Sequence, residues 1–143
     1  MVKLGIGLVL AAFVFLPACG GSDDETPEET SDSIEIGGTW ISVFGGTETI
    51  DDESWTSESP GGSYPSEIVE FSNADNAAVL LAGDGTYGRN VWTTPSDEGF
   101  HYCTVSYGKD SVEAAIDESV IADESDLDAS GCNAFPWTQL TRE

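Results

Sequence analysis

From residue 34 onward, apolar residues come in short runs that glycine, aspartate, asparagine and proline interrupt. Such punctuation is typical of β-strands joined by tight turns. Strands that recur at roughly ten-residue spacing are found in antiparallel sandwiches and small barrels. The sequence therefore predicts an all-β, mainly antiparallel domain over residues 34–143, built as a small barrel or a sandwich.

Individual strands can be placed from the runs and their punctuation. The expected strands are 38–44, 47–50, 67–71, 77–82, 86–94, 100–107 and 135–140. Asp84-Gly85 is the strongest hairpin signal in the chain. A period of two puts Arg89 and Trp92 on opposite faces of their strand. Residues 51–65 are expected to form a polar loop, with Trp55 as the tryptophan nearest to solvent.

Only one segment looks helical. Asp110 or Ser111 can cap residues 112–116, where an acidic side chain in the first turn suits the helix dipole. We expect this short helix to cover one end of the sheet.

The first nineteen residues have a different character. A basic start, Met1-Val2-Lys3, precedes fifteen uncharged residues, 4–18. At ~1.5 Å per residue such a helix spans roughly 22 Å, which is short of the ~30 Å hydrocarbon core of a bilayer. The pattern of a basic region, an apolar region and a small residue before a cleavage point predicts a signal peptide over residues 1–18.

The end of this signal, Leu16-Pro17-Ala18-Cys19, resembles the lipobox of bacterial lipoproteins. The resemblance implies cleavage before Cys19, a diacylglycerol on its thiol and an acyl chain, such as palmitate, on its new amino group. Multiple acyl chains are enough for stable anchoring without a transmembrane span. We expect a protein held in the bacterial cell envelope, at the outer membrane, with its periplasmic or surface orientation undecided.

A flexible tether is expected to follow the lipidated cysteine. Residues 20–33 contain six acidic residues, no basic one and no apolar side chain larger than proline. Such a segment cannot bury enough surface to offset its ordering entropy. The predicted organisation is therefore a signal peptide (1–18), a lipidated tether (19–33) and one β domain (34–143).

The net charge limits the partners. The chain carries 27 acidic residues and a formal charge of −23, and removal of Lys3 with the signal makes the mature chain more negative still. So acidic a surface repels nucleic-acid phosphates and anionic headgroups, which excludes nucleic acid as a partner and leaves the acyl chains as the membrane anchor. The charge suits a monomer held off the membrane.

The chain has three cysteines, of which one is expected to carry the lipid and two remain available to pair with each other. If a lipid occupies Cys19, Cys103 and Cys132 remain, and an exported chain reaches an oxidising space where they can form a disulfide. The alternatives are two free thiols, or a zinc site that includes His101, the sole histidine. Zinc usually has four ligands, so the disulfide is the favoured prediction.

Gly38-Thr39-Trp40 near the start of the β domain resembles the Gly-x-Trp motif that opens lipocalins and related calycin barrels. In that family the tryptophan closes one barrel end and a basic residue near the last strand packs over it. The resemblance implies this role for Arg142, and it also implies a cavity for a small apolar ligand.

Catalytic motifs are weak. The segment Gly61-Gly62-Ser63-Tyr64-Pro65 fails the last position of the Gly-x-Ser-x-Gly elbow. His101 lies in the middle of an expected strand, where packing or surface exposure is the usual role. We therefore predict no catalytic residues, no enzymatic activity and no cofactor besides the covalent lipid.

One acidic segment resembles a metal site. Residues 126–131 match the first half of a calcium-binding EF-hand loop, including its glycine, but Trp137 stands at the twelfth position in place of glutamate. The segment is therefore not an EF-hand. A weaker calcium site at Asp123, Asp126 and Asp128 and a solvated acidic loop both remain open.

These observations leave three functions of different classes. The leading one is a lipid-anchored envelope lipoprotein with a non-catalytic interaction or structural domain, whose partner is another envelope protein. The alternative is a lipocalin-like carrier of a small apolar ligand. An envelope hydrolase is a distant third.

Overall fold

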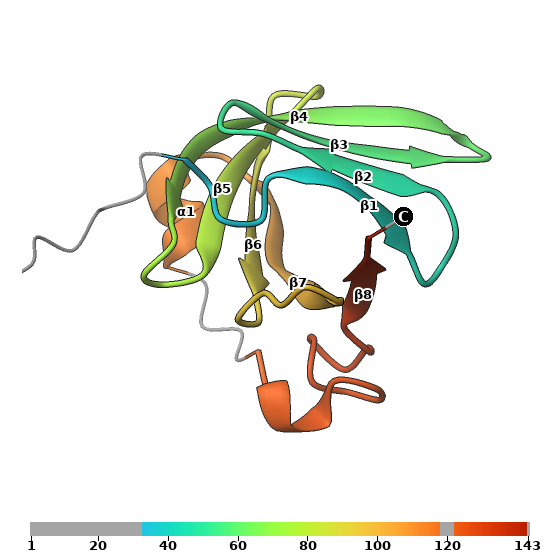
Figure 1. Ribbon diagram of the computed structural model, residues 1–143. Coiled ribbons are helices and arrows are strands. Elements are labelled where there is room, and N and C mark those ends of the chain that lie inside the picture. The colour runs from blue at the N-terminus through green and yellow to red at the C-terminus, as the bar shows by residue number, and fades with distance from the viewer. Residues whose placement is uncertain (1–32, 118–121, 143) are drawn as a thin grey trace, which may run out of the picture.

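The computed structural model describes residues 33–117 and 122–142. Eight antiparallel strands pair in chain order, and β1 pairs with β8 to close a barrel (Figure 1). The strands are β1 (Gly38–Ser42), β2 (Thr47–Ile50), β3 (Ser54–Ser59), β4 (Gly62–Ser72), β5 (Ala77–Ala82), β6 (Tyr87–Trp92), β7 (Gly99–Lys109) and β8 (Thr138–Thr141). The predicted all-β class is confirmed, and the architecture is a barrel. The signal peptide, Cys19 and the tether up to residue 32 lie outside the described residues.

The two ends of the barrel differ. The turns 51–53, 73–76 and 93–98 share one end with the segment that leads into β1 and with the residues after β8, and we call it the closed end. The turns 43–46, 60–61 and 83–86 lie at the other end, which we call the open end. The chain therefore enters and leaves the barrel at the closed end.

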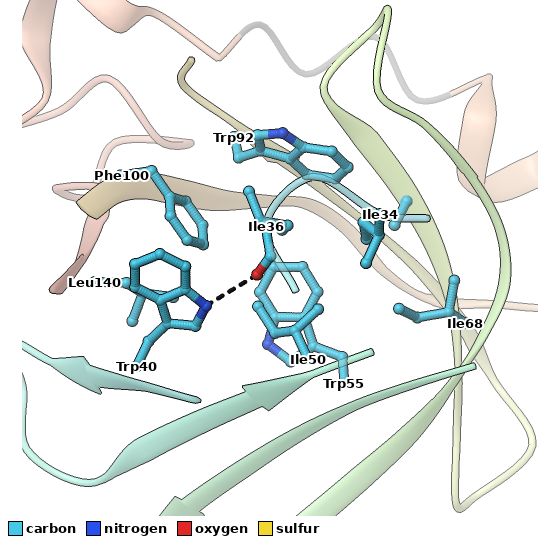
Figure 2. Packing of buried hydrophobic residues seen from close by; sticks show 10 residues of the cluster. Ile34, Ile36, Trp40, Ile50, Trp55, Ile68, Trp92, Phe100 and Leu140 are labelled. Atoms are coloured by element: carbon cyan, nitrogen blue, oxygen red, sulfur yellow. Dashed lines mark hydrogen bonds between the residues drawn. The ribbon is translucent and has the colours of Figure 1, made fainter. Parts of the chain in front are cut away.

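A core of apolar side chains fills the closed end. Its buried members point toward one another (Figure 2) and are Ile34, Ile36, Trp40, Ile50, Trp55, Ile68, Ala78, Trp92, Phe100 and Leu140. The segment before β1 lies across this end, because the Ile34 amide donates to Asp52 Oδ1 at 2.7 Å and the Glu35 amide donates to Asn73 Oδ1 at 3.0 Å. The Trp92 indole N–H also donates to Glu35 Oε1 at 2.7 Å.

A second, smaller core lies outside the barrel wall. Cys103, Val105, Cys132 and Trp137 form it, with Val91, Ala122 and Leu127 packed against them. Phe100 and Tyr102 of β7 pack in the inner core, so Cys103 faces outward by alternation. The predicted Cys103–Cys132 disulfide is present, with 5.5 Å between the two Cα atoms. It ties residues 122–137, which include a 3-10 turn (Glu124–Asp126), to the outer face of β7.

The single helix, α1 (Val112–Ile116), is where the sequence predicts it, and Ser111 is its cap. The Ser111 hydroxyl oxygen accepts from the Ala114 amide at 3.2 Å. The expectation that the helix covers an end of the sheet is wrong, because α1 packs against the outer wall made by β5, β6 and β7. The Ser106 hydroxyl of β7 donates to the Ala115 carbonyl at 2.9 Å and fixes this position.

The expected polar loop over 51–65 is also wrong. These residues form β3 and the start of β4, and Trp55 is 2% exposed, not the tryptophan nearest to solvent. The inward positions that follow Trp55 carry hydroxyl groups, because this part of the barrel interior is polar. The usual alternation of apolar and polar residues is therefore absent from the sequence of this hairpin. Within the described ranges, no helix has the length and hydrophobicity needed to span a bilayer.

Candidate ligand-binding lumen

The structure brings together the three residues of the calycin-like pattern at the closed end. Trp40 is 1% exposed, its indole N–H donates to the Ile36 carbonyl at 2.9 Å, and its ring meets Phe100 edge-on at 4.9 Å between centroids. The Arg142 guanidinium lies 4.6 Å from the centre of the Trp40 ring. Gly38 is the first residue of β1 and has φ +134°, a backbone conformation that residues other than glycine rarely adopt. This end of the barrel is thus plugged by Trp40 and covered by Arg142.

Above the plug, the barrel encloses a cavity of about 220 Å³ that reaches toward the open end. Residues of β3 to β7 line it. Trp55, Leu80 and Ala82 supply apolar surface, whereas Ser57, Asn90, Tyr102 and Thr104 supply polar groups. The lumen is therefore mixed in character, whereas the resemblance to lipocalins implies a cavity for a small apolar ligand.

A buried carboxylate lies behind the lining. Glu48 on β2 is 6% exposed. Its Oε2 accepts from the Trp55 indole N–H at 2.9 Å and from the Ser57 hydroxyl at 2.5 Å, and its Oε1 accepts from the Tyr102 hydroxyl at 3.3 Å. A buried charge is costly unless hydrogen bonds compensate it. Three neutral donors hold this one, and all three donor residues line the cavity.

Sequence reasoning missed Glu48, although a signal was present. Glu48 precedes Ile50 by two residues, so a strand over 47–50 that buries Ile50 also turns Glu48 inward. In the barrel it also stands opposite Trp40 of β1. An acidic residue on the inward face of a short strand is therefore the feature that would have identified it.

Tyr102 connects this carboxylate to the lumen. Its ring packs against Trp55, with 5.1 Å between the centroids. Burial raises the pKa of Tyr102 well above its ordinary value, and the neighbouring Glu48 carboxylate raises this pKa further. The Tyr102 phenol therefore stays neutral, and its hydroxyl hydrogen remains in place for the hydrogen bond that it donates to Glu48.

Three hydroxyl groups of the lining present acceptors rather than donors to a ligand. A hydroxyl has one hydrogen, and those of Ser57 and Tyr102 are directed at Glu48. The hydroxyl of Thr104 donates to Asn90 Oδ1 at 2.7 Å. All three hydroxyl oxygens therefore have lone pairs left for a bound molecule that donates hydrogen bonds.

The open end has an apolar rim on one side. β8 begins at Thr138, whereas β7 continues to Lys109, so a groove of about 410 Å³ opens between the 132–136 segment and the turn after β1. Phe44 and Phe135 line it and are each 67% exposed. Tyr102 and Thr104 line both this groove and the lumen, so the two hollows adjoin.

Comparisons with known protein families, curated proteins and solved structures gave no match to this chain. The barrel and its lumen are therefore the features from which a function can be inferred.

The calcium candidate is not assembled. The carboxylate of Asp123 accepts from the amide and hydroxyl of Ser125, which lowers the pKa of Asp123. Asp126 Oδ2 accepts in the same way from the amide and hydroxyl of Ser130. Within residues 33–117 and 122–142, no three histidine, cysteine or acidic side chains gather as a metal site, so Asp123, Asp126 and Asp128 do not converge.

His101 lies away from the lumen. It pairs with Gln139 of β8, and its amide donates to the Thr93 hydroxyl at 3.0 Å. Because its neighbours Phe100 and Tyr102 pack in the inner core, the His101 side chain points out of the barrel. Cys103 is in the disulfide, so these two residues do not form a zinc site.

Proposed function

We propose that this chain is a lipid-anchored lipoprotein of the bacterial cell envelope whose barrel is a non-catalytic domain that binds a small ligand. The observation that carries the ligand-binding part is the lumen, in which polar groups around Glu48 converge on a cavity with apolar walls. A few convergent polar groups in an otherwise apolar hollow are typical of small-molecule sites. The mixed lining favours a partly polar ligand over a purely apolar one.

The segment that would lead back to the lipid anchor enters the barrel at the closed end, and the mouth of the lumen is at the open end. The described chain begins at Ser33, at the closed end, where the Ser33 carbonyl accepts from the Asn73 side chain. The residues between Cys19 and Ser33 can reach at most about 50 Å when extended. A lipid on Cys19 would thus tether the barrel to the membrane through its closed end, and the mouth of the lumen is at the opposite end of the barrel.

A non-catalytic role agrees with the chemistry of the lumen. His101 points away from it, and Glu48 is engaged by three hydrogen bonds. No lumen-lining residue is a histidine or a cysteine. A Ser–His or Cys–His pair, as many hydrolases use, is therefore not among the groups that line the cavity.

The anchor is tested by replacing Cys19 with serine. We expect wild-type protein to incorporate labelled palmitate in cells and to require detergent for extraction from the membrane pellet. The Cys19→Ser variant should incorporate no label, because it lacks the thiol that starts lipid attachment. Ser22→Ala, a change in the same segment, should be labelled like the wild type. Palmitate incorporation by Cys19→Ser would contradict the lipoprotein assignment.

Ligand binding is tested by native mass spectrometry of protein purified gently from its own envelope. We expect a fraction of the protein to carry an additional small-molecule mass. Ala82→Phe should abolish that mass, because Ala82 lines the lumen and phenylalanine would fill it. Ile41→Phe places the same side chain on the exposed outer face of β1 and should leave the ligand in place.

The apolar rim favours a second candidate function, the docking of another envelope protein. Val43, Phe44 and Phe135 are well exposed beside the open end, and clustered exposed apolar side chains mark interaction sites. Protein that carries no additional mass in the native spectrum would favour this function over ligand binding.

A further inference from the structure

We infer that the lumen selects small organic cations, namely primary amines with a compact apolar body, over neutral or anionic molecules of the same shape. The inference rests on the proposed ligand-binding function and specifies the class of ligand. Three independent features of the lumen carry it.

The first feature is that neutral hydrogen-bond donors, and no cation, hold the Glu48 carboxylate. Its hydrogen-bond partners Trp55, Ser57 and Tyr102 are all neutral. The basic residues of the described chain are engaged elsewhere than in the lining: Arg142 covers Trp40, Arg89 lines a groove between β4, β5 and α1, and Lys109 ends β7. Within the described ranges no basic side chain lines the cavity, so a cation in the lumen would be the positive charge nearest to the lining, and reduced solvation there strengthens its attraction to this carboxylate.

The second feature is the direction of the hydroxyl hydrogens. The hydroxyls of Ser57 and Tyr102 donate to Glu48 and offer lone pairs to the cavity. A carboxylate has about four acceptor positions, of which Glu48 uses three. An ammonium group has donors and no acceptor, so it matches these oxygens, whereas a carboxylate ligand would meet their lone pairs and find donors only elsewhere in the lining, for example on the Asn90 amide.

The third feature is the shape and lining of the remaining space. Its volume of about 220 Å³ corresponds to roughly seven water molecules at ~30 Å³ each. Leu80, Ala82 and the rings of Trp55 and Tyr102 form apolar walls. A hydrated metal ion would gain nothing from such walls and would find a single carboxylate, whereas an amine with a small apolar body uses both kinds of surface.

The test compares three probes with one common body: benzylammonium, benzyl alcohol and benzoate. Affinity for the wild-type protein is measured by calorimetry and by tryptophan fluorescence, to which Trp55 in the lumen wall reports. We expect benzylammonium to bind about tenfold more tightly than benzyl alcohol, because its ammonium group is attracted to the partly solvated Glu48 carboxylate. Benzoate should bind most weakly.

The Glu48→Gln variant removes the charge and retains an acceptor, so its preference for benzylammonium over benzyl alcohol should disappear. Glu58→Gln makes the same change at an exposed position of β3 and should retain the tenfold preference. The ranking of the three probes on wild-type protein needs no variant, so it decides the inference even where Glu48→Gln fails to fold by circular dichroism.

The outcomes separate the inference from the function on which it rests. Equal affinities for the three probes would overturn the selection of cations and leave a ligand-binding barrel. Binding of none of them at millimolar concentration would overturn the lumen as a binding site. A tenfold preference that survives Glu48→Gln in a folded protein would overturn the role of Glu48.

Discussion

Replacement of Trp40 by alanine should lower the free energy of unfolding by about 3–5 kcal/mol, the usual cost of deleting a buried tryptophan side chain. Trp40 is almost fully buried, meets Phe100 edge-on and donates a hydrogen bond to the Ile36 carbonyl. Alanine would leave a cavity at the closed end and an unpaired carbonyl in the segment that crosses it. For a domain of this size the melting temperature should fall by at least about 12 °C.

Urea unfolding followed by circular dichroism measures this loss, and two matched variants locate its origin. Ile41→Ala changes the next residue of β1, whose side chain is partly exposed, and should cost less than about 1 kcal/mol. Arg142→Gln removes only the cation over the Trp40 ring and should cost about 0.5–1 kcal/mol, because Arg142 is exposed. A loss below about 1 kcal/mol for Trp40→Ala would contradict the description of Trp40 as the plug of the barrel.

Removal of the disulfide should have the second largest effect on stability. In the double variant with Cys103→Ala and Cys132→Ala we expect a loss of about 2–4 kcal/mol and a fall in melting temperature of roughly 10–20 °C. The bond joins residues separated by 29 positions, and it holds residues 122–137 over the outer face of β7. Without it the unfolded chain gains freedom, and the outer core has only its apolar contacts.

Thermal unfolding with and without a reductant checks this prediction. Wild-type protein in reductant should melt near the temperature of the double variant, whereas the double variant should not respond to the reductant. Cys19→Ser is the control, because it also removes a cysteine and should leave the melting temperature unchanged. An unchanged melting temperature in the double variant would show that the apolar contacts of Val105 and Trp137 suffice to hold the segment.

Several local elements could be predicted because neighbouring residues determine them. The hairpin at Asp84-Gly85 is an example: the Asp84 carboxylate accepts from the Thr86 amide at 3.0 Å, Gly85 has φ +85°, and the Ala82 amide donates to the Thr86 carbonyl at 2.9 Å. The Ser111 cap of α1 is also local, because its hydroxyl accepts from an amide three residues ahead. Such interactions depend on sequence neighbours alone, so they are readable without a structure.

The lumen could not be predicted in the same way. The Ser-rich and Thr-rich segment 51–65 resembles a loop, and only its place between β2 and the rest of β4 makes it a strand hairpin with Trp55 buried inside. Glu48 illustrates the same limit, because its partners Trp55, Ser57 and Tyr102 come from two other strands, and Tyr102 is 54 residues away. The calcium candidate also needed the structure, which shows that no three acidic side chains gather as a metal site in the described part of the chain.

By itself, the sequence determined the β class, the turns outside residues 51–65, the short helix and the pair of cysteines available for a disulfide, and it predicts the lipid anchor. Turn chemistry, capping and composition act over a few residues, and this is why they can be read in order along the chain. Only the tertiary structure decided that the strands close into a barrel, through pairing of residues as distant as Ile41 and Thr141, and that Glu48 is buried behind the lining of a lumen. Closure of the barrel and burial of Glu48 depend on which strands pack together although they are distant in sequence. That is a property of the whole folded chain.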